Sequence, residues 1–173
     1  MNTPDEYIQS VMRTFKLANP QQIKWGHAVN TCAMLEAALN EPTLHFLECD
    51  VGYGLYRRGS DSGVEKSGNE NDEGHKDLIT AHFPTTTSSD LYFVKLVDEV
   101  RAHNQRAMKW SSEDGSLQAA PPCMKGLKID FKHLSAVKAC VELKKKFLKK
   151  IFGYLARCEF WAKIGLRFWI LVG

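Results

Sequence analysis

This sequence lacks the features that define several common classes of protein. No CxxC pair occurs in it, and the five cysteines are odd in number and widely spaced: Cys32, Cys49, Cys123, Cys140 and Cys158. Such spacing argues against a disulfide framework and against a zinc site, so we expect small buried thiols. Residues 1–15 carry early acids and no apolar core, and no signal peptide is predicted. The apolar run at 168–173 is far too short to span a bilayer, and no transmembrane segment is predicted.

A strong charge of one sign is also missing, apart from one short segment. The formal net charge is +3, and much of the excess lies in KKKFLKK at 144–150. Outside that segment no basic patch is interleaved with aromatic residues, so no nucleic-acid partner is predicted. The lysines of 138–150 circle too much of a predicted helix to form a membrane-binding face, and we expect them to be solvated.

What is present is typical of one soluble globular domain. A content of 44% hydrophobic and 25% charged residues is ordinary for that class, and the length allows a core of useful size. The TPDE motif at 3–6 is a helix-start signal. We therefore predict an N-terminal helix within 1–21, an α/β domain over 22–158 and an apolar tail over 159–173.

Strand and helix patterns alternate along most of the predicted domain. Strands are predicted at 22–27, 43–51, 77–82 and 126–131. Helices are predicted at 31–40, 88–104 and 135–158, and long polar loops at 55–76 and 105–125. Alternation of this kind is typical of a parallel sheet. We expect four adjacent parallel strands with helices on the outside.

Charged and imidazole side chains gather at the ends of these strands: His27, Glu48, Asp50, His82, Lys128, Asp130 and Lys132. In a strand, residues i and i+2 point to the same face, so Glu48 and Asp50 share one direction. The C-termini of parallel strands lie on one side of a sheet, where ligands bind. A single histidine at a strand end is usually a hydrogen-bonded structural residue, and two acids at i and i+2 usually face solvent from an exposed strand. Three acids together, however, repel each other and lose hydration, and they are held most easily by a cation.

Oxygen ligands without thiolates favour Mg²⁺ or Ca²⁺ over zinc. We predict that this cation is bound by three carboxylates, those of Glu48, Asp50 and Asp130. The donor set therefore predicts a site for a hard divalent cation at the strand ends.

The basic residues near these acids suit work on a phosphodiester. Histidines beside a carboxylate-bound metal are suited to general acid–base chemistry, and we assign that role to His27 and His82. Lys132 is placed to balance the charge of a phosphate in the transition state. Asn30 and Lys128 are predicted to bind substrate.

Four blocks of the sequence closely resemble the menorin family: WGHAVN at 25–30, LECDV at 47–51, ITAHFP at 79–84 and GLKIDFKHLSAV at 126–137. More distantly they look like glycerophosphodiester phosphodiesterases and other phospholipase-C-like barrels. The resemblance implies a (β/α)₈ TIM-type barrel, in which 22–158 is a half-barrel and 159–173 an unmatched tail. A closed barrel needs about 250 residues, so the chain looks like a truncated isoform.

The resemblance implies the same roles for the two histidines, the three carboxylates and Lys132, but it leaves two functions open. The enzymes have Arg after the first histidine and usually Asp after the second, where this chain has Ala28 and Phe83. The menorin pattern has two prolines after the second histidine, and this chain keeps only Pro84. Menorins are known mainly as extracellular or cell-surface factors in neuronal branching. The chain is therefore either a metal-dependent phosphodiester hydrolase or a non-enzymatic signalling protein with a vestigial pocket and a cell-surface protein partner.

Localisation and stability follow from the same resemblance. The family points to the extracellular space, whereas the missing signal peptide and the free cysteines point to the cytoplasm. Half a ring would leave the first and fourth strands as open edges. Each large apolar side chain left exposed would forgo about 1.5–3 kcal/mol. We expect a marginal chain that aggregates, or a homodimer through the open barrel edges.

Overall fold

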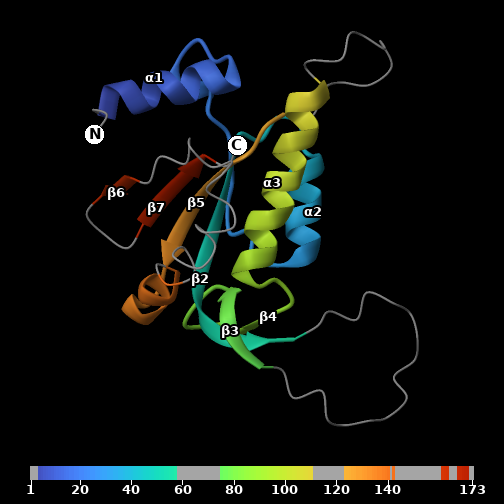
Figure 1. Cartoon of the computed structure of the whole chain (residues 1–173), viewed down its shortest axis with the longest axis vertical. Helices are drawn as coiled ribbons and strands as arrows, with labels where there is room; N and C mark the ends of the chain where they lie inside the picture. Colours follow the sequence, from blue (N-terminus) through green and yellow to red (C-terminus); the bar gives the residue numbers. More distant parts are fainter. Residues whose placement is uncertain are drawn as a thin grey trace.

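A computed structural model describes residues 4–57, 75–110, 123–140, 142, 161–163 and 167–171. The elements follow in the order α1 (Pro4–Phe15), η1 (Pro20–Gln22), β1 (Trp25–Gly26), α2 (Cys32–Asn40), β2 (Phe46–Tyr56), β3 (His75–Thr80), β4 (Ser88–Ser89), α3 (Phe93–Trp110), β5 (Gly126–Phe131), β6 (Trp161–Lys163) and β7 (Arg167–Leu171). Residues 134–140 are also helical. The chain is thus a mixed α/β protein, as its alternating patterns predicted (Figure 1).

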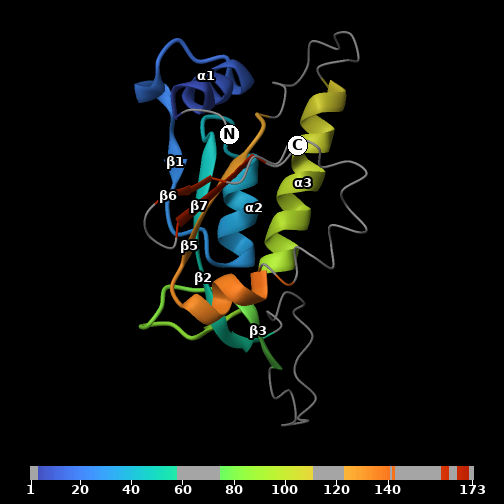
Figure 2. The same cartoon turned by 60° about the vertical axis from the view of Figure 1, so that its left-hand side comes forward.

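Three adjacent strands of the sheet, β1, β2 and β5, are parallel. β2 pairs in parallel with β1, with Trp25 opposite Phe46, and with β5 from Gly126 opposite Phe46 to Phe131 opposite Val51. α2 and α3 lie side by side against this sheet (Figures 1 and 2). Over the described residues the sheet is open, with the order β1-β2-β5-β7-β6, and is not a closed barrel.

The prediction of a third parallel strand is wrong. β3 runs antiparallel to β2, with Thr80 opposite Val51 and His75 opposite Tyr56. Two features of the sequence explain this. β2 continues five residues past its predicted end at Val51, which leaves a length of strand to pair with. The sequence between β2 and β3 carries no helix pattern, and parallel neighbours need a crossover that is usually helical. β5 is therefore the direct parallel neighbour of β2.

The tail pairs with the fourth predicted strand, whose edge was expected to be open unless the tail covered it. β7 pairs antiparallel with β5, from Leu171 opposite Gly126 to Arg167 opposite Asp130, and β6 pairs with β7. The edge of the fourth strand is thus covered by the tail and is not open. β1 is the last strand at the other end of the order, and a homodimer through that edge stays a prediction. Most of the predicted basic helix at 135–158 lies outside the described residues.

Alternate residues of β2 and β5 give the sheet two different faces. The apolar face consists of Leu47, Cys49, Val51, Leu127, Ile129 and Phe131, which are buried in one cluster with side chains of α2 and α3. The charged face consists of Glu48, Asp50, Lys128 and Asp130. The division follows from the two-residue period of a strand. Helices bury one face, and the other is left for polar groups.

α1 covers the start of the second face with apolar side chains. Val11 and Phe15, four residues apart on α1, are buried with Phe46. The Phe46 ring stacks on Trp25 with centroids 4.7 Å apart, and it lies so close to Gly126 that a Cβ there would clash. The predicted N-terminal helix is confirmed, and its packing fixes the N-terminal ends of the strands below the charged face.

The four described cysteines are free. Cys49 and Cys140 are buried, as predicted, while Cys32 and Cys123 are half-buried. Burial raises the pKa of the Cys49 thiol, and the neighbouring charges of Asp50 and Glu48 raise it further. Cys49 is therefore a neutral core side chain. Of the helices in the described parts of the chain, none is long and apolar enough to cross a membrane.

Candidate functional site

Strand register brings the four side chains of the charged face together. Glu48 lies opposite Lys128, and Asp50 lies opposite Asp130. Because each pair is two residues from the next, all four side chains leave the sheet on the same side. Only 8–14% of each side chain is exposed. Three carboxylates and an ammonium group are thus held close together and are largely shielded from solvent.

Lys128 joins the two strands across the charged face. Its Nζ lies 2.7 Å from Glu48 Oε2 and 3.8 Å from Asp130 Oδ1. His27 approaches Glu48 from the other side, with Nε2 3.5 Å from Oε1, and its ring is 75% exposed. Glu48 therefore lies between a buried cation and an imidazole that is open to solvent.

Two side chains, those of Lys132 and Asn30, hold Asp50. Lys132 Nζ lies 2.5 Å from Oδ1, and Asn30 Nδ2 donates to Oδ2 at 3.1 Å. Asn30 Oδ1 also accepts the backbone N–H of Asp50 at 2.9 Å. The backbone carbonyl of Asn30 accepts the hydroxyls of Thr80 and Ser89 at 3.0 and 2.8 Å. Asn30, which we predicted to bind substrate, has its amide occupied by Asp50 and positions that carboxylate.

His27 and Asn30 both lie on the short segment between β1 and α2. Val29 N–H donates to the carbonyl of Glu48 at 2.8 Å, which ties the segment to β2. Ala28 has a φ of 54°, a left-handed conformation that is uncommon for a residue with a Cβ. The turn lies between His27 and Asn30, and both of these residues contact acids of the charged face.

His82 reaches the same end of the sheet from the opposite chain direction. Ala81 N–H donates to the carbonyl of Asp50 at 2.9 Å, so β3 ends beside the acids although it is antiparallel. The His82 ring is exposed, and its Nδ1 lies 3.1 Å from Thr85 Oγ1. Because that hydroxyl donates to the His82 carbonyl at 2.7 Å, the ring nitrogen is the donor. His82 thus lies beside the acids just past the end of an antiparallel strand, not of the predicted parallel one, and its ring is paired with Thr85.

The three carboxylates fit a hard divalent cation in their donor chemistry. Within the described stretches, however, no group of three or more His, Cys, Asp or Glu side chains is arranged to hold a metal ion. Lys128 and Lys132 already hold the acids that we predicted as ligands. As it stands, the site is a network of ion pairs whose cations are the chain's own lysines.

Sequence reasoning missed these pairings and two polar groups away from the charged face. Lys128 and Lys132 each lie two residues from Asp130 in the sequence, and this spacing could have indicated the ion pairs. Lys125 is buried, its Nζ donates to the carbonyls of Glu41 and Leu44 at 2.6 and 2.7 Å, and desolvation lowers its pKa. No comparable pattern in the sequence marked this contact, because it joins the residue just before β5 to a turn far away in the chain.

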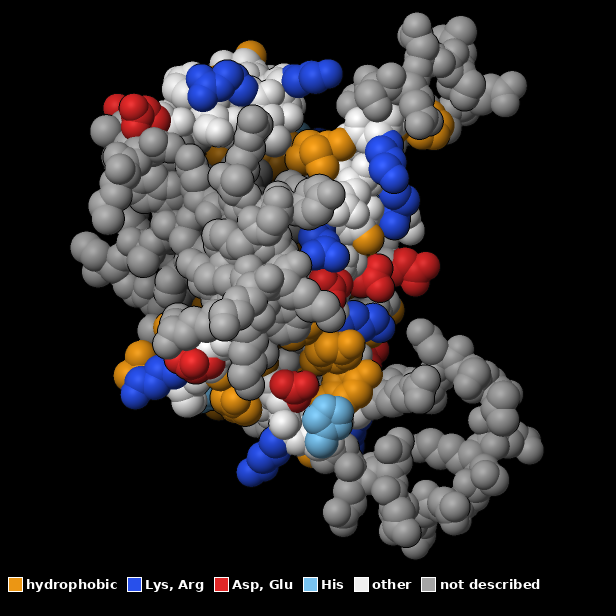
Figure 3. Space-filling model, in the orientation of Figure 1, with side chains coloured by type: hydrophobic (Ala, Val, Ile, Leu, Met, Phe, Trp, Pro, Cys, Tyr) orange, Lys and Arg blue, Asp and Glu red, His pale blue; other side chains and the backbone are white. Residues whose placement is uncertain are grey.

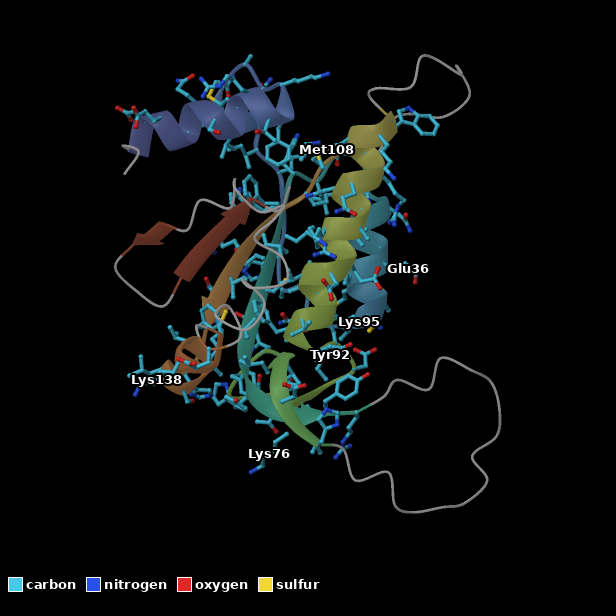
Figure 4. The ribbon with its side chains drawn as sticks, viewed as in Figure 1. Glu36, Lys76, Tyr92, Lys95, Met108 and Lys138 are labelled. Carbon is cyan, nitrogen blue, oxygen red and sulfur yellow. The ribbon has the colours of Figure 1, made fainter. Side chains whose placement is uncertain are left out.

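The second group joins the two helices. Lys95 Nζ lies 3.2 Å from Cys32 Sγ, and this hydrogen bond raises the pKa of Lys95 (Figure 4). Around α3 the visible Lys and Arg side chains are interspersed with Asp and Glu (Figure 3). The surface shown there therefore carries mixed charge, and the absence of a nucleic-acid partner stays a prediction.

No family model, curated protein or solved structure matches this chain. The resemblance to menorins therefore stays a prediction that rests on four blocks of sequence. The charged face and the histidines beside it are therefore the features that bear on function.

Proposed function

We propose that this chain is a menorin-like protein with a phosphodiesterase-type site, which binds Mg²⁺ or Ca²⁺ and a phosphodiester on its charged face. One observation carries the proposal: three nearly buried carboxylates lie together on one face of the parallel pair β2–β5, with Asp50 opposite Asp130 next to the C-terminal end of that pairing. Ligands of open α/β sheets bind at that end. Burying charged groups is costly, so a face that served folding alone would be expected to be apolar.

Each side chain has a role in this proposal that follows from its position. The three carboxylates would hold the cation, which would supply positive charge to a phosphate oxygen. His27 is exposed beside Glu48 and would exchange a proton with the ligand at Nε2. His82 would serve as the second acid–base group. Lys132, 30% exposed beside Asp50, would face the phosphate and balance its charge.

The proposal extends to the fold. β1, β2 and β5 would be neighbouring strands of an incomplete (β/α)₈ TIM-type barrel, with the charged face on its inside. Parallel order and the cover of α2 and α3 on the apolar face support this. In this arrangement β3 would be an antiparallel extension at the rim that carries His82.

A second function has an observation of its own. Phe83 stands where the distant enzymes usually have Asp, and its ring is buried against the rim, with its centroid 5.4 Å from that of His133. A packed aromatic ring at that position cannot replace a carboxylate. In this second proposal the charged face is a vestigial pocket that catalyses no reaction. The chain then acts through a cell-surface protein partner.

Calorimetric titration with Mg²⁺ and Ca²⁺ tests the first proposal. We expect wild-type protein to bind a cation and Asp130→Asn to bind it at least about tenfold more weakly, since a ligand charge is lost. Asp98→Asn removes the same charge from an exposed position on α3 and is the matched control. Wild-type protein without any cation binding would overturn the first proposal.

Hydrolysis of glycerophosphodiesters then separates the two functions. We expect wild-type turnover to need the cation and to fall about 100-fold or more in His27→Asn, as general acid–base catalysis contributes about that much. Cation binding with no turnover would favour the second function. His75→Asn, on an exposed ring paired with Asp77, is the matched control.

A further inference from the structure

Lys128 contacts acids on both strands of the charged face. Its ammonium group lies between the carboxylates of Glu48 and Asp130, one from each of two neighbouring strands. All three side chains are 9–14% exposed. Without a positive charge between them, the two nearly buried acids would repel each other. Lys128 therefore already occupies the place where a divalent ion would bridge the strands.

An ammonium group and a metal ion cannot both fill that place. The Lys128 nitrogen lies 2.7 Å from Glu48 Oε2, and divalent ions bind oxygen at about 2.0–2.6 Å. An ion that binds Glu48 Oε2 and Asp130 Oδ1, the two oxygens that Lys128 contacts, has to displace the lysine. The side chain of lysine is a flexible four-carbon stem that can carry its charge elsewhere by changing rotamer. Asp50, the third proposed ligand, is held by Lys132 and Asn30.

We propose that Lys128 is a tethered counter-cation that exchanges with the divalent ion. In the absence of the ion, the ammonium group holds Glu48 and Asp130 together; when the ion binds, Lys128 leaves the acids and becomes accessible to solvent. This inference rests on the proposed cation site and adds its regulation. Cation affinity is then set by the competition with Lys128, and removing the ammonium group strengthens binding.

The first test is Lys128→Met, which keeps most of the stem and removes the charge. We expect calorimetry to show about 10- to 100-fold tighter Ca²⁺ binding than wild type, the range for loss of one charge-assisted contact. Lys138→Met, an equal charge change on an exposed residue of 134–140, should leave affinity unchanged (Figure 4). Lys128→Met binding no tighter than wild type would overturn the exchange.

A second test uses wild-type protein and does not depend on the variant folding. An amine-specific reagent and mass spectrometry would measure the labelling rate of each lysine with and without Ca²⁺. We expect Ca²⁺ to raise the rate at Lys128 several-fold and to leave that at Lys138 unchanged. A bound, Asp130-dependent ion that leaves the Lys128 rate unchanged would overturn the exchange.

The outcomes separate this inference from the proposed function. If wild type binds Ca²⁺ through Asp130 but Lys128→Met binds no tighter, the exchange is wrong and the cation site stands. If neither protein binds Ca²⁺, the cation site is wrong and the exchange fails with it. If only Lys128→Met binds detectably, the exchange is supported, and the lysine is what keeps wild-type protein free of metal.

Discussion

The two faces of the central sheet are made by the same two strands, yet they are built on different principles. Every residue of the apolar face is at most 4% exposed and packs against the helices. The charged face is almost as well buried but needs a partner for each charge. Full burial of a large apolar side chain contributes about 1.5–3 kcal/mol, whereas a buried ion pair often gains nothing over an apolar pair. The apolar face accounts for folding, and binding is the role that we propose for the charged face.

The largest stability effect should come from the apolar face. Ile129 is fully buried, and Ile129→Ala should lower the free energy of unfolding by about 2–5 kcal/mol through lost burial and a cavity. Urea unfolding measures this. Leu134→Ala, at a side chain 60% exposed, is the control and should change it by less than about 0.5 kcal/mol. Equal effects of the two substitutions would mean that burial on the apolar face does not account for the stability of the fold.

A double-mutant cycle on the charged face comes next. Glu48→Gln and Lys128→Met should each destabilise the chain, because each leaves a nearly buried charge without its partner. The double variant should recover most of the loss, with a coupling energy of up to about 3 kcal/mol. Additive losses would mean that the two side chains do not interact as their 2.7 Å contact implies.

A smaller effect on the free energy of unfolding is expected at Asn30, which positions Asp50. Asn30→Ala removes two hydrogen bonds to Asp50 and should cost about 1–2 kcal/mol. Asn40→Ala, on an exposed residue at the end of α2, is the matched control. If both substitutions leave the unfolding free energy unchanged, Asn30 does not support Asp50.

The smallest effect concerns pH and lies at the start of β2, away from the charged face. His45 Nδ1 accepts the backbone N–H of Lys24 at 3.0 Å, which requires an unprotonated nitrogen. Desolvation, and then the charges of Lys125 and Lys24, lower the pKa of His45 below its usual 6.5. Because the folded pKa is below the unfolded one, stability is complete above pH 6.5 and falls as the unfolded state takes up the proton first.

His45→Gln should therefore lose slightly less stability than wild type between pH 7 and pH 5.5. Urea unfolding at both pH values measures the difference. His75→Gln is the control, since its ring is 68% exposed. An equal decline in wild type and His45→Gln would show that His45 does not contribute to the acid response.

Local patterns predicted much of the fold. The bounds of β5 were predicted correctly at 126–131, and those of α2 within one residue, because apolar periods and caps lie within each segment. The direction of β3 and the pairing of β7 could not be predicted in the same way. Both depend on which strand edge is free, and that is decided by segments far away in the chain.

The same distinction applies to the site. The shared direction of Glu48 and Asp50 follows from their spacing alone. The contact of Lys128 with Glu48 depends on the register between β2 and β5, which neither segment specifies by itself. The sequence therefore predicted the members of the charged face, but not which of them would be paired.

The most direct test of the account is to locate the cation. Crystals soaked in Mn²⁺ and measured at its absorption edge would show where the ion binds. We predict an anomalous peak between Glu48 and Asp130, about 2.0–2.6 Å from their carboxylate oxygens, with the Lys128 ammonium group displaced. Saturating Mn²⁺ with no peak on the charged face, and Lys128 still 2.7 Å from Glu48, would contradict it.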